Sequence, residues 1–411
     1  MNFGRGFTWP APFREAAAVR VLDITEWFGE TSGGVRTYLN EKAAYVAGRP
    51  DFAQVLVVPG QEDAMSEEPG RRCYRLRGPH IPTQKPYRFM LATRSIRRII
   101  ETERPSVIEV GSCFAVPWIV KRGARGAGIP LVGFFHGNLA RTVCPFPEQA
   151  NAVTRRIYDT TWKYMRAVYG RCDLTVCASE FAAADLAAHG VERVAVVPLG
   201  VDLAHFHPRR HEYACETREA LGLPTDRRLF AFVGRFAREK EIDVLLEAWP
   251  EIERKTDAGL VLVGDGHQRQ QVDALARRSD RVYRLPYQSD RDALANLLAA
   301  VDVIVSPGSA ETFGLCALES LSSGTPVLAA DRGGVAEQLA RSGAGTTFAA
   351  GESESLAAAA IDLIERDDLP MLGFRGREYA EREHIAVDSV FCVQRYGPFA
   401  WTDYAASATS R

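Results

Sequence analysis

Two glutamates eight residues apart, Glu311 and Glu319, lie in a stretch that follows a predicted strand at 301–305 and opens a predicted helix. Free backbone N–H groups and the positive end of a helix dipole at such a junction suit a phosphate or a sugar hydroxyl. Eight residues of helix rise about 12 Å, so the two carboxylates can reach separate hydroxyl clusters of one elongated ligand. The alternative is a glutamate that favours the dipole of the first turn and a second glutamate on a solvated face. The pair alone leaves both interpretations open.

A basic pair, Arg235 and Lys240, comes directly after the predicted strand 229–233. Arg235 offers a planar fork of donors, and Lys240 offers a compact positive charge. Together they match a diphosphate whose negative charge grows as it departs from a substrate. The alternative is the basic, solvated start of a helix.

Paired glycines and a histidine follow two further predicted strands. Gly33 and Gly34 let backbone amides approach a phosphate closely, although their loop lacks the Gly-x-Gly-x-x-Gly spacing of a dinucleotide site. A turn without a ligand would also explain them. His136 leaves the end of the predicted strand 131–135, where a histidine is either structural or a ligand contact.

Metal ligation has little support in the sequence. Asp290 and Asp292 resemble a metal-binding Asp-x-Asp pair, but Ser289 to Asp292 has the spacing of a helix capping box. The eight cysteines contain no Cys-x-x-Cys pair, which argues against a zinc site or a disulfide framework. We therefore expect neither a metal nor another cofactor.

The elements that must position these residues repeat in two halves of the chain. Short apolar runs alternate with helical patterns, and such runs predict parallel sheets covered on both faces. The predicted strands are 19–24, 54–58, 107–110, 131–135, 174–177 and 194–197, then 229–233, 260–263, 281–285, 301–305 and 326–329. We predict an α/β protein with two Rossmann-like, doubly wound domains, 1–200 and 201–380, facing across a cleft, and a last segment at 381–411. Ligands of such sheets bind at the carboxyl ends of the strands.

The bulk composition agrees with two soluble domains. The chain has 411 residues, 46% hydrophobic and 25% charged. No apolar span approaches about 18 residues, and the start lacks the apolar core of a signal peptide. We expect a cytoplasmic protein on these grounds.

The net charge of −2 hides an asymmetry between the halves. Residues 1–200 carry 26 Lys and Arg against 19 Asp and Glu, a net +7, which leaves −9 for residues 201–411. The densest basic cluster runs from Lys85 to Arg98 with apolar residues interleaved, and residues 155–171 are similar. Such segments either lie on an anionic membrane surface or form ordinary amphipathic helices with a solvated polar face. We expect no nucleic acid partner.

Together these loops resemble those of the retaining glycosyltransferases of the GT-B fold, family GT4, over roughly residues 19–348. The most specific element is Glu-x7-Glu at Glu311 and Glu319, supported by Arg235 with Lys240, by the paired glycines and by His136. Residues 197–202 are similar to the family's crossing between domains. Within this family, the chain particularly resembles the GDP-mannose-dependent α-mannosyltransferases that act on phosphatidylinositol mannosides or related glycolipids.

The resemblance implies a role for each matching residue. The catalytic group would be His136 at the transferred sugar, Arg235 and Lys240 at the leaving diphosphate, and Glu311 at a sugar hydroxyl. The donor would further contact Gly33, Gly34, Arg284, Leu285, Phe313, Gly314, Leu315 and Glu319. Among these, Glu319 would hold the ribose, and the backbone near Arg284 and Leu285 would hold the nucleobase. Family members need no metal ion.

The implied reaction is retaining transfer of a hexose, with mannose from GDP-mannose favoured, to a lipid-linked or glycolipid acceptor. No second carboxylate stands out as a nucleophile for double displacement, which favours same-face attack. The enzyme would then act as a peripheral protein on the inner face of the membrane. Three alternatives remain: a UDP-sugar-dependent hexosyltransferase for polysaccharide or glycolipid, a nucleotide-sugar epimerase, and an idle binding module.

Two departures from the family pattern stand out. Lys240 is followed by Glu241 where the family often has glycine, so the next helix is expected to start differently. The region 381–411 is expected to cross back to the first domain, but its helical part lacks the tryptophan that the resemblance implies.

Overall fold

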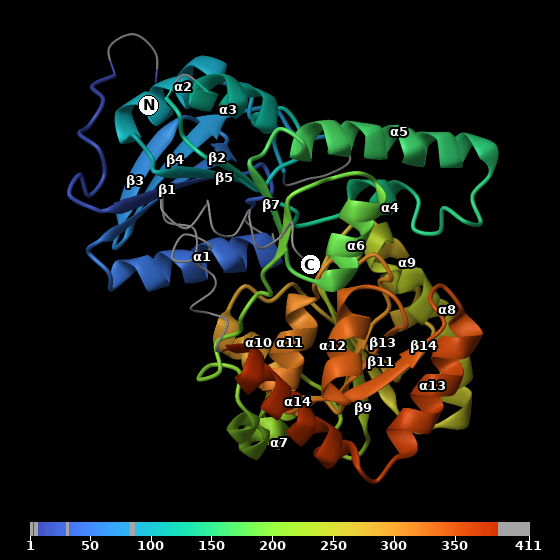
Figure 1. The fold of residues 1–411 in the computed structure, drawn as a ribbon. Helices are drawn as coiled ribbons and strands as arrows, with labels where there is room; N and C mark the ends of the chain where they lie inside the picture. The colour runs from blue at the N-terminus through green and yellow to red at the C-terminus, as the bar shows by residue number, and fades with distance from the viewer. Residues whose placement is uncertain (1–2, 4–6, 30–32, 83–86, 126, 385–411) are drawn as a thin grey trace.

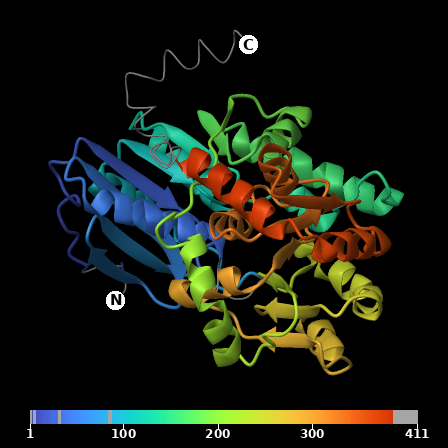
Figure 2. The same cartoon turned by 90° about the horizontal axis from the view of Figure 1, so that it is seen from below.

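A computed structural model describes residue 3 and residues 7–29, 33–82, 87–125 and 127–384 of the chain. It contains two sheet domains, which lie one above the other in Figure 1. Seen from below, the blue strands of the first domain and the yellow and orange strands of the second occupy separate regions of the molecule (Figure 2). The predicted α/β architecture with two parallel-sheet domains is confirmed.

The first domain is built on an eight-stranded sheet in the order β3-β4-β2-β1-β5-β6-β7-β8, parallel except for the β3–β4 pair. Its strands are β1 (Val19–Ile24), β2 (Phe52–Gly60), β3 (Ala64–Glu68), β4 (Arg71–Arg77), β5 (Val107–Val110), β6 (Leu131–Phe134), β7 (Leu174–Cys177) and β8 (Val194–Val196). The sequence did not predict β3 and β4. Both are rich in charged residues, and they form a hairpin at the sheet edge that has no continuous apolar run.

Six helices of the first domain are α1 (Gly34–Ala47), α2 (Thr93–Glu103), α3 (Val116–Arg125), α4 (Leu139–Val143), α5 (Ala152–Tyr169) and α6 (Glu180–Ala188). Helix α2 carries most of the basic cluster that was considered for membrane contact. Its Ile96, Ile99 and Ile100 are buried in the domain core, whereas Arg97 and Arg98 are exposed. The isoleucines of this helix are therefore committed to the core and not to a lipid surface.

The second basic stretch, residues 155–171, falls largely on α5. Tyr158, Trp162 and Met165 face the core, whereas Ile157, and Val153 just before the stretch, are exposed. Among the described residues, no helix combines the length and the apolar character that crossing a membrane requires.

The second domain has a six-stranded, fully parallel sheet in the order β11-β10-β9-β12-β13-β14. Its strands are β9 (Leu229–Val233), β10 (Gly259–Val263), β11 (Val282–Leu285), β12 (Val303–Ser306), β13 (Val327–Ala330) and β14 (Gly345–Phe348). Its helices are η1 (Pro208–Tyr213), α7 (Ala214–Ala220), η2 (Arg238–Lys240), α8 (Ile242–Lys255), α9 (Arg269–Ala276), α10 (Arg291–Ala300), α11 (Leu315–Ser322), α12 (Gly334–Ser342), α13 (Ser353–Glu365) and α14 (Leu369–His384). Strand β14 was not predicted, since this short edge strand carries two threonines between Gly345 and Phe348.

The second sheet is buried on both faces, as its apolar strands predicted. Phe230 and Phe232 of β9 pack on one side with Trp249 of α8. Leu229 and Ala231 of the same strand pack on the other side with the α10 residues. Because successive side chains of a strand point to opposite faces, a strand without polar positions needs a helical layer on each side.

The two domains meet through α6 and α12 and through the loop before α11. Ser179 Oγ donates to the Thr312 carbonyl oxygen at 2.5 Å, and Thr312 Oγ1 donates to the His136 carbonyl oxygen at 2.9 Å. These bonds place the second-domain loop directly against the end of β6. Since β8 ends at Val196 and β9 begins at Leu229, we propose the division between domains near residue 200.

The last described helix, α14, packs on α11 of the second domain. Arg377 of α14 donates to the carbonyl oxygens of Leu203, Phe206 and Ser322, which ties this helix to the connection between domains. The expected return to the first domain concerns 381–411. Residues 381–384 continue α14, and 385–411 lie outside the described residues.

Candidate active site

A cavity of about 450 Å³ lies between the domains, at the carboxyl ends of strands from both sheets. Ten of the twelve predicted site residues line it: Gly33, Gly34, His136, Arg235, Lys240, Glu311, Phe313, Gly314, Leu315 and Glu319. The loops that follow parallel strands all lie at the same edge of the sheet. Motifs that are far apart in the sequence therefore come together there.

Lys240 and Glu311 form an ion pair across the cavity wall. Lys240 ends η2 after β9, and Glu311 lies in the loop between β12 and α11. Burial works to lower the pKa of Lys240, but the adjacent Glu311 carboxylate outweighs it and the pKa is raised. The ammonium group therefore stays charged, and its position is set by a carboxylate that can also accept a hydrogen bond from a hydroxyl group.

Arg235 reaches the same cavity from the first turn after β9. Its Nη2 lies 2.5 Å from Glu239 Oε1, and its guanidinium carbon is 5.7 Å from the ring centroid of Tyr87. Tyr87 belongs to the first domain, so Arg235 contacts both walls. The carboxylate and the aromatic ring together hold the guanidinium group at the cleft.

Glu319 lies on α11 with only 5% of its surface exposed. Burial raises the pKa of Glu319 to about 7, against the opposing effect of the nearby Arg291 guanidinium. Arg291 Nη1 is 3.1 Å from Glu319 Oε1, and its Nη2 is 3.5 Å from Glu41 Oε1 on α1 of the first domain. Arg291 thus links the two walls beside Glu319.

The sequence analysis did not identify Arg291 as a site residue. It lies between Asp290 and Asp292, which the sequence pattern suggested only as a metal-binding pair or as part of a helix cap. Asp290 Oδ1 accepts from the backbone N–H groups of Asp292 and Ala293, so Asp290 and not Ser289 caps α10. The residue after a cap begins the helix, and this places Arg291 at the end facing the cavity.

His136 is held flat against Phe134, with ring centroids 3.9 Å apart and planes 4° apart. Burial, with a contribution from the buried Lys42 charge, lowers the pKa of His136 to about 3. Lys42 is neutralised by Asp23 and Glu109, at 2.6 and 3.0 Å from its Nζ. The imidazole is therefore neutral near pH 7. It can donate or accept a hydrogen bond with a ligand, but it cannot deliver a proton as an acid.

Helix starts supply the backbone donors. Gly314 precedes α11 with φ 86°, and a Cβ added there would lie 2.2 Å from Val335 Cγ2. Glycine is required at this turn, which aims the first amides of α11 at the cavity. At Gly33 and Gly34, an added Cβ would meet nothing within 4 Å among the described residues. Packing within the described chain therefore does not demand these two glycines, and space remains for a ligand next to α1.

Arg284 and Leu285 are placed differently from the other predicted residues. In the described structure the cavity lining does not include them, and on this side it begins at Tyr287 and continues to Arg291. Arg284 Nε lies 2.9 Å from Asp273 Oδ1, and Leu285 packs against the domain core. Both residues still belong to β11, so their side chains are engaged within the sheet layers. The residues that follow the strand are the ones that reach the cleft.

The described residues contain no group of three or more His, Cys, Asp or Glu side chains placed to hold a metal ion.

The profile described as "Glycosyltransferase Family 4" matches residues 32–205, and the profile "Glycosyl transferases group 1" matches residues 215–375. A GDP-mannose-dependent alpha-(1-6)-phosphatidylinositol dimannoside mannosyltransferase of Mycobacterium tuberculosis is 32% identical over 368 residues, which cover 85% of this chain and 89% of that protein.

Solved structures share the fold at lower identity. Sucrose-phosphate synthase from Thermosynechococcus elongatus superposes with a TM-score of 0.73 at 20% identity, covering 90% of this chain and 97% of that one. Anabaena HepE in complex with UDP-glucose gives 0.68 at 17% identity, with 95% and 100% covered. The chain belongs to the family 4 glycosyltransferases of the GT-B fold, and it is a hexosyltransferase.

Proposed function

We propose that this enzyme transfers mannose from GDP-mannose to a lipid-linked or glycolipid acceptor and forms an α-glycosidic bond. The observation that carries the proposal is the 32% identity to a mannosyltransferase whose name specifies GDP-mannose and a phosphatidylinositol dimannoside. That similarity covers 85% of the chain and so includes both walls of the cavity.

In the proposed mechanism, fixed charges stabilise the departing diphosphate. Lys240 and Arg235 face the diphosphate. Their positive charges stabilise the negative charge that grows on the diphosphate as its bond to the sugar breaks. Glu311, held by Lys240, accepts a hydrogen bond from a sugar hydroxyl. Glu319 accepts hydrogen bonds from the ribose, with Arg291 beside it.

The bond exchange takes place on one face of the sugar. The anomeric carbon loses its bond to the diphosphate oxygen and gains a bond to the acceptor oxygen, and the acceptor's proton passes to the departing phosphate. Neutral His136 positions the transferred sugar. We place the nucleobase against residues 287–290, which line the cavity beyond the end of β11.

We further propose that the first domain contacts an anionic membrane through exposed arginines of α2. The exposed residues are Arg94, Arg97 and Arg98. Because the isoleucines of this helix are buried, the attraction would be electrostatic and would weaken with salt. Liposome flotation tests it: binding to anionic vesicles and not to neutral ones is expected, and equal binding to both would contradict it.

A thermal-shift series with GDP, UDP and ADP tests the donor. A ligand at 100 times its dissociation constant adds about 2.7 kcal/mol to stability, so the preferred base gives the largest shift at equal concentration. Transfer of labelled mannose from GDP-mannose into extracted lipid is the second expected result. A larger shift with UDP, or conversion of the donor without acceptor, would instead favour the UDP-sugar transferase or the epimerase.

A further inference from the structure

Glu241 combines two unfavourable features at one position next to the cavity. Its backbone is left-handed, with φ 48° and ψ 37°, which glycine adopts freely but other residues adopt at a cost. Its side chain is buried, with 4% exposed, and burial raises the pKa of the carboxyl. Strain of this kind persists where the surrounding structure determines it, and it gathers at functional sites.

Glu241 stands where the family often has glycine, and the sequence therefore predicted that the following helix, α8, would start differently. The left-handed backbone conformation that glycine favours is present with glutamate in its place.

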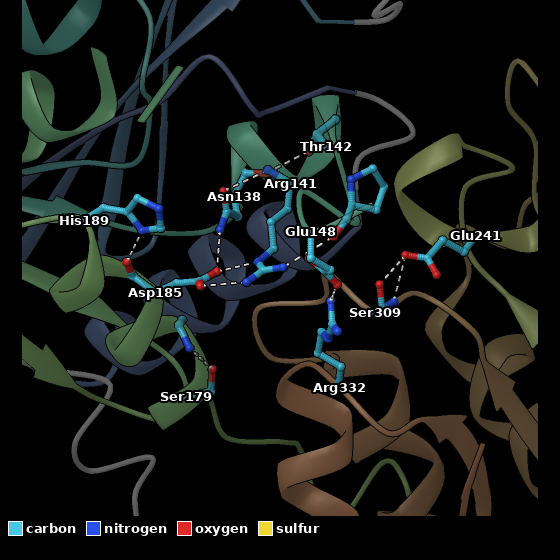
Figure 3. A network of polar contacts seen from close by, with 12 residues as sticks. Asn138, Arg141, Thr142, Glu148, Ser179, Asp185, His189, Glu241, Ser309 and Arg332 are labelled. Carbon is cyan, nitrogen blue, oxygen red and sulfur yellow. Dashed lines mark hydrogen bonds and ion pairs between the residues drawn. The ribbon is translucent and has the colours of Figure 1, made fainter. Parts of the chain in front are cut away.

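The carboxylate of Glu241 is directed at the loop after β12 and not at its own helix. Its Oε1 accepts from Ser309 N–H at 3.1 Å and from Ser309 Oγ at 2.5 Å (Figure 3). Within the described residues it makes no capping bond to α8, and its Oε2 has no hydrogen-bond partner. Helix capping therefore does not account for the residue.

The two segments joined by this contact carry the ion pair of the active site. Glu241 directly follows Lys240, and Ser309 lies two residues before Glu311. The segments are also packed closely, because a Cβ at Gly308 would lie 3.3 Å from Lys240 Cα. One buried carboxylate thus connects the backbone that presents the cation to the backbone that presents its carboxylate partner.

We propose that Glu241 is a positioning residue for hexosyl transfer, which holds the Lys240 segment and the Glu311 loop in register through Ser309. The inference rests on the proposed roles of Lys240 at the diphosphate and Glu311 at the sugar. Since these contacts matter most as the diphosphate departs, loss of register lowers turnover more than donor binding.

The test compares Glu241→Gly, Glu241→Gln and Arg104→Gly by steady-state kinetics and thermal denaturation. Glu241→Gly removes both the strain and the connection, so we expect kcat to fall about 10-fold or more with an unchanged or higher melting temperature. Glu241→Gln keeps an oxygen acceptor for Ser309, and kcat is expected within about threefold of wild type. Arg104 has the same left-handed backbone, φ 47°, at the end of α2, and its change to glycine controls for strain relief alone.

Unchanged kcat in Glu241→Gly would overturn the proposal, as would a Gln variant as slow as the Gly variant at equal stability. If Glu241→Gly does not fold, Ser309→Ala decides, because it removes only the hydroxyl bond: a kcat lowered at least threefold supports the connection, and an unchanged kcat contradicts it. If the wild type transfers no sugar from GDP-mannose, the proposed donor fails on its own. The positioning role is then judged by calorimetric affinity for GDP and UDP, which Glu241→Gly must weaken and Glu241→Gln must not.

Discussion

Replacing Glu319 with glutamine should make the protein's stability less sensitive to pH. Glu319 is almost fully buried on α11, and burial raises its pKa from 4.5 to about 7 despite Arg291. The folded state therefore holds the proton more tightly than the unfolded state. Stability from this group is complete below the unfolded value and is lost as pH rises through about 7.

The size of the effect follows from the two pKa values. A difference of about 2.5 units at 1.36 kcal/mol each corresponds to about 3 kcal/mol. The neutral amide of Glu319→Gln has no such dependence, so the variant should gain about 3 kcal/mol relative to wild type between about pH 4.5 and 7. For a domain of this size, that is a relative rise in melting temperature of about 6 to 12 °C.

The assay is thermal denaturation of both proteins, without ligand, at several pH values from about 5 to 8. Glu26, whose pKa burial also raises to about 7, is present in both proteins, so its contribution cancels in the difference. Glu354→Gln on α13, where the side chain is exposed, is the matched control for the change from glutamate to glutamine itself. A flat difference for Glu319→Gln would refute the argument that this carboxyl is destabilised by burial.

Three further outcomes follow from the site. Arg235→Ala or Lys240→Ala should lower the transfer rate by about 10²–10³, because each removes a preorganised charge from the departing diphosphate, and near-wild-type turnover would reject their assignment. Gly314→Ala should lower both the melting temperature and the affinity for GDP, since its Cβ would lie 2.2 Å from Val335 Cγ2 and its φ is 86°; an unchanged melting temperature would contradict the required turn. His136→Gln should slow transfer by the same factor at every pH from about 5 to 8, because the pKa of His136 is lowered to about 3; a factor that changes across this range would show that the imidazole titrates there.

Local patterns were sufficient for most of the sheet architecture. The β-branched runs predicted eleven strands. Each corresponds to a strand of the structure, and the predicted and observed ends differ by at most two residues. Buried parallel strands need apolar side chains on both faces, so their sequences are distinctive. The strands that were missed, β3, β4 and β14, lie at sheet edges or in a hairpin, where one face is less covered and polar residues are tolerated.

Local patterns could not decide which surface covers an amphipathic helix. The isoleucines of α2 have the spacing of an apolar face, and that spacing is the same for a helix on a protein core and one on a membrane. Only the packed structure, in which Ile96 and Ile99 are buried, distinguishes the two.

By itself the sequence determined that two parallel sheets would form and that glycines, bases and glutamates would follow their strands. Only the tertiary structure decided how these groups are paired: Lys240 with Glu311, Arg291 with both Glu319 and Glu41, and Glu241 with Ser309. A strand's character depends on its own residues and their immediate neighbours. An ion pair depends on the approach of segments that are tens to hundreds of residues apart, and burial where such segments meet raises the pKa of Glu319 and Glu241.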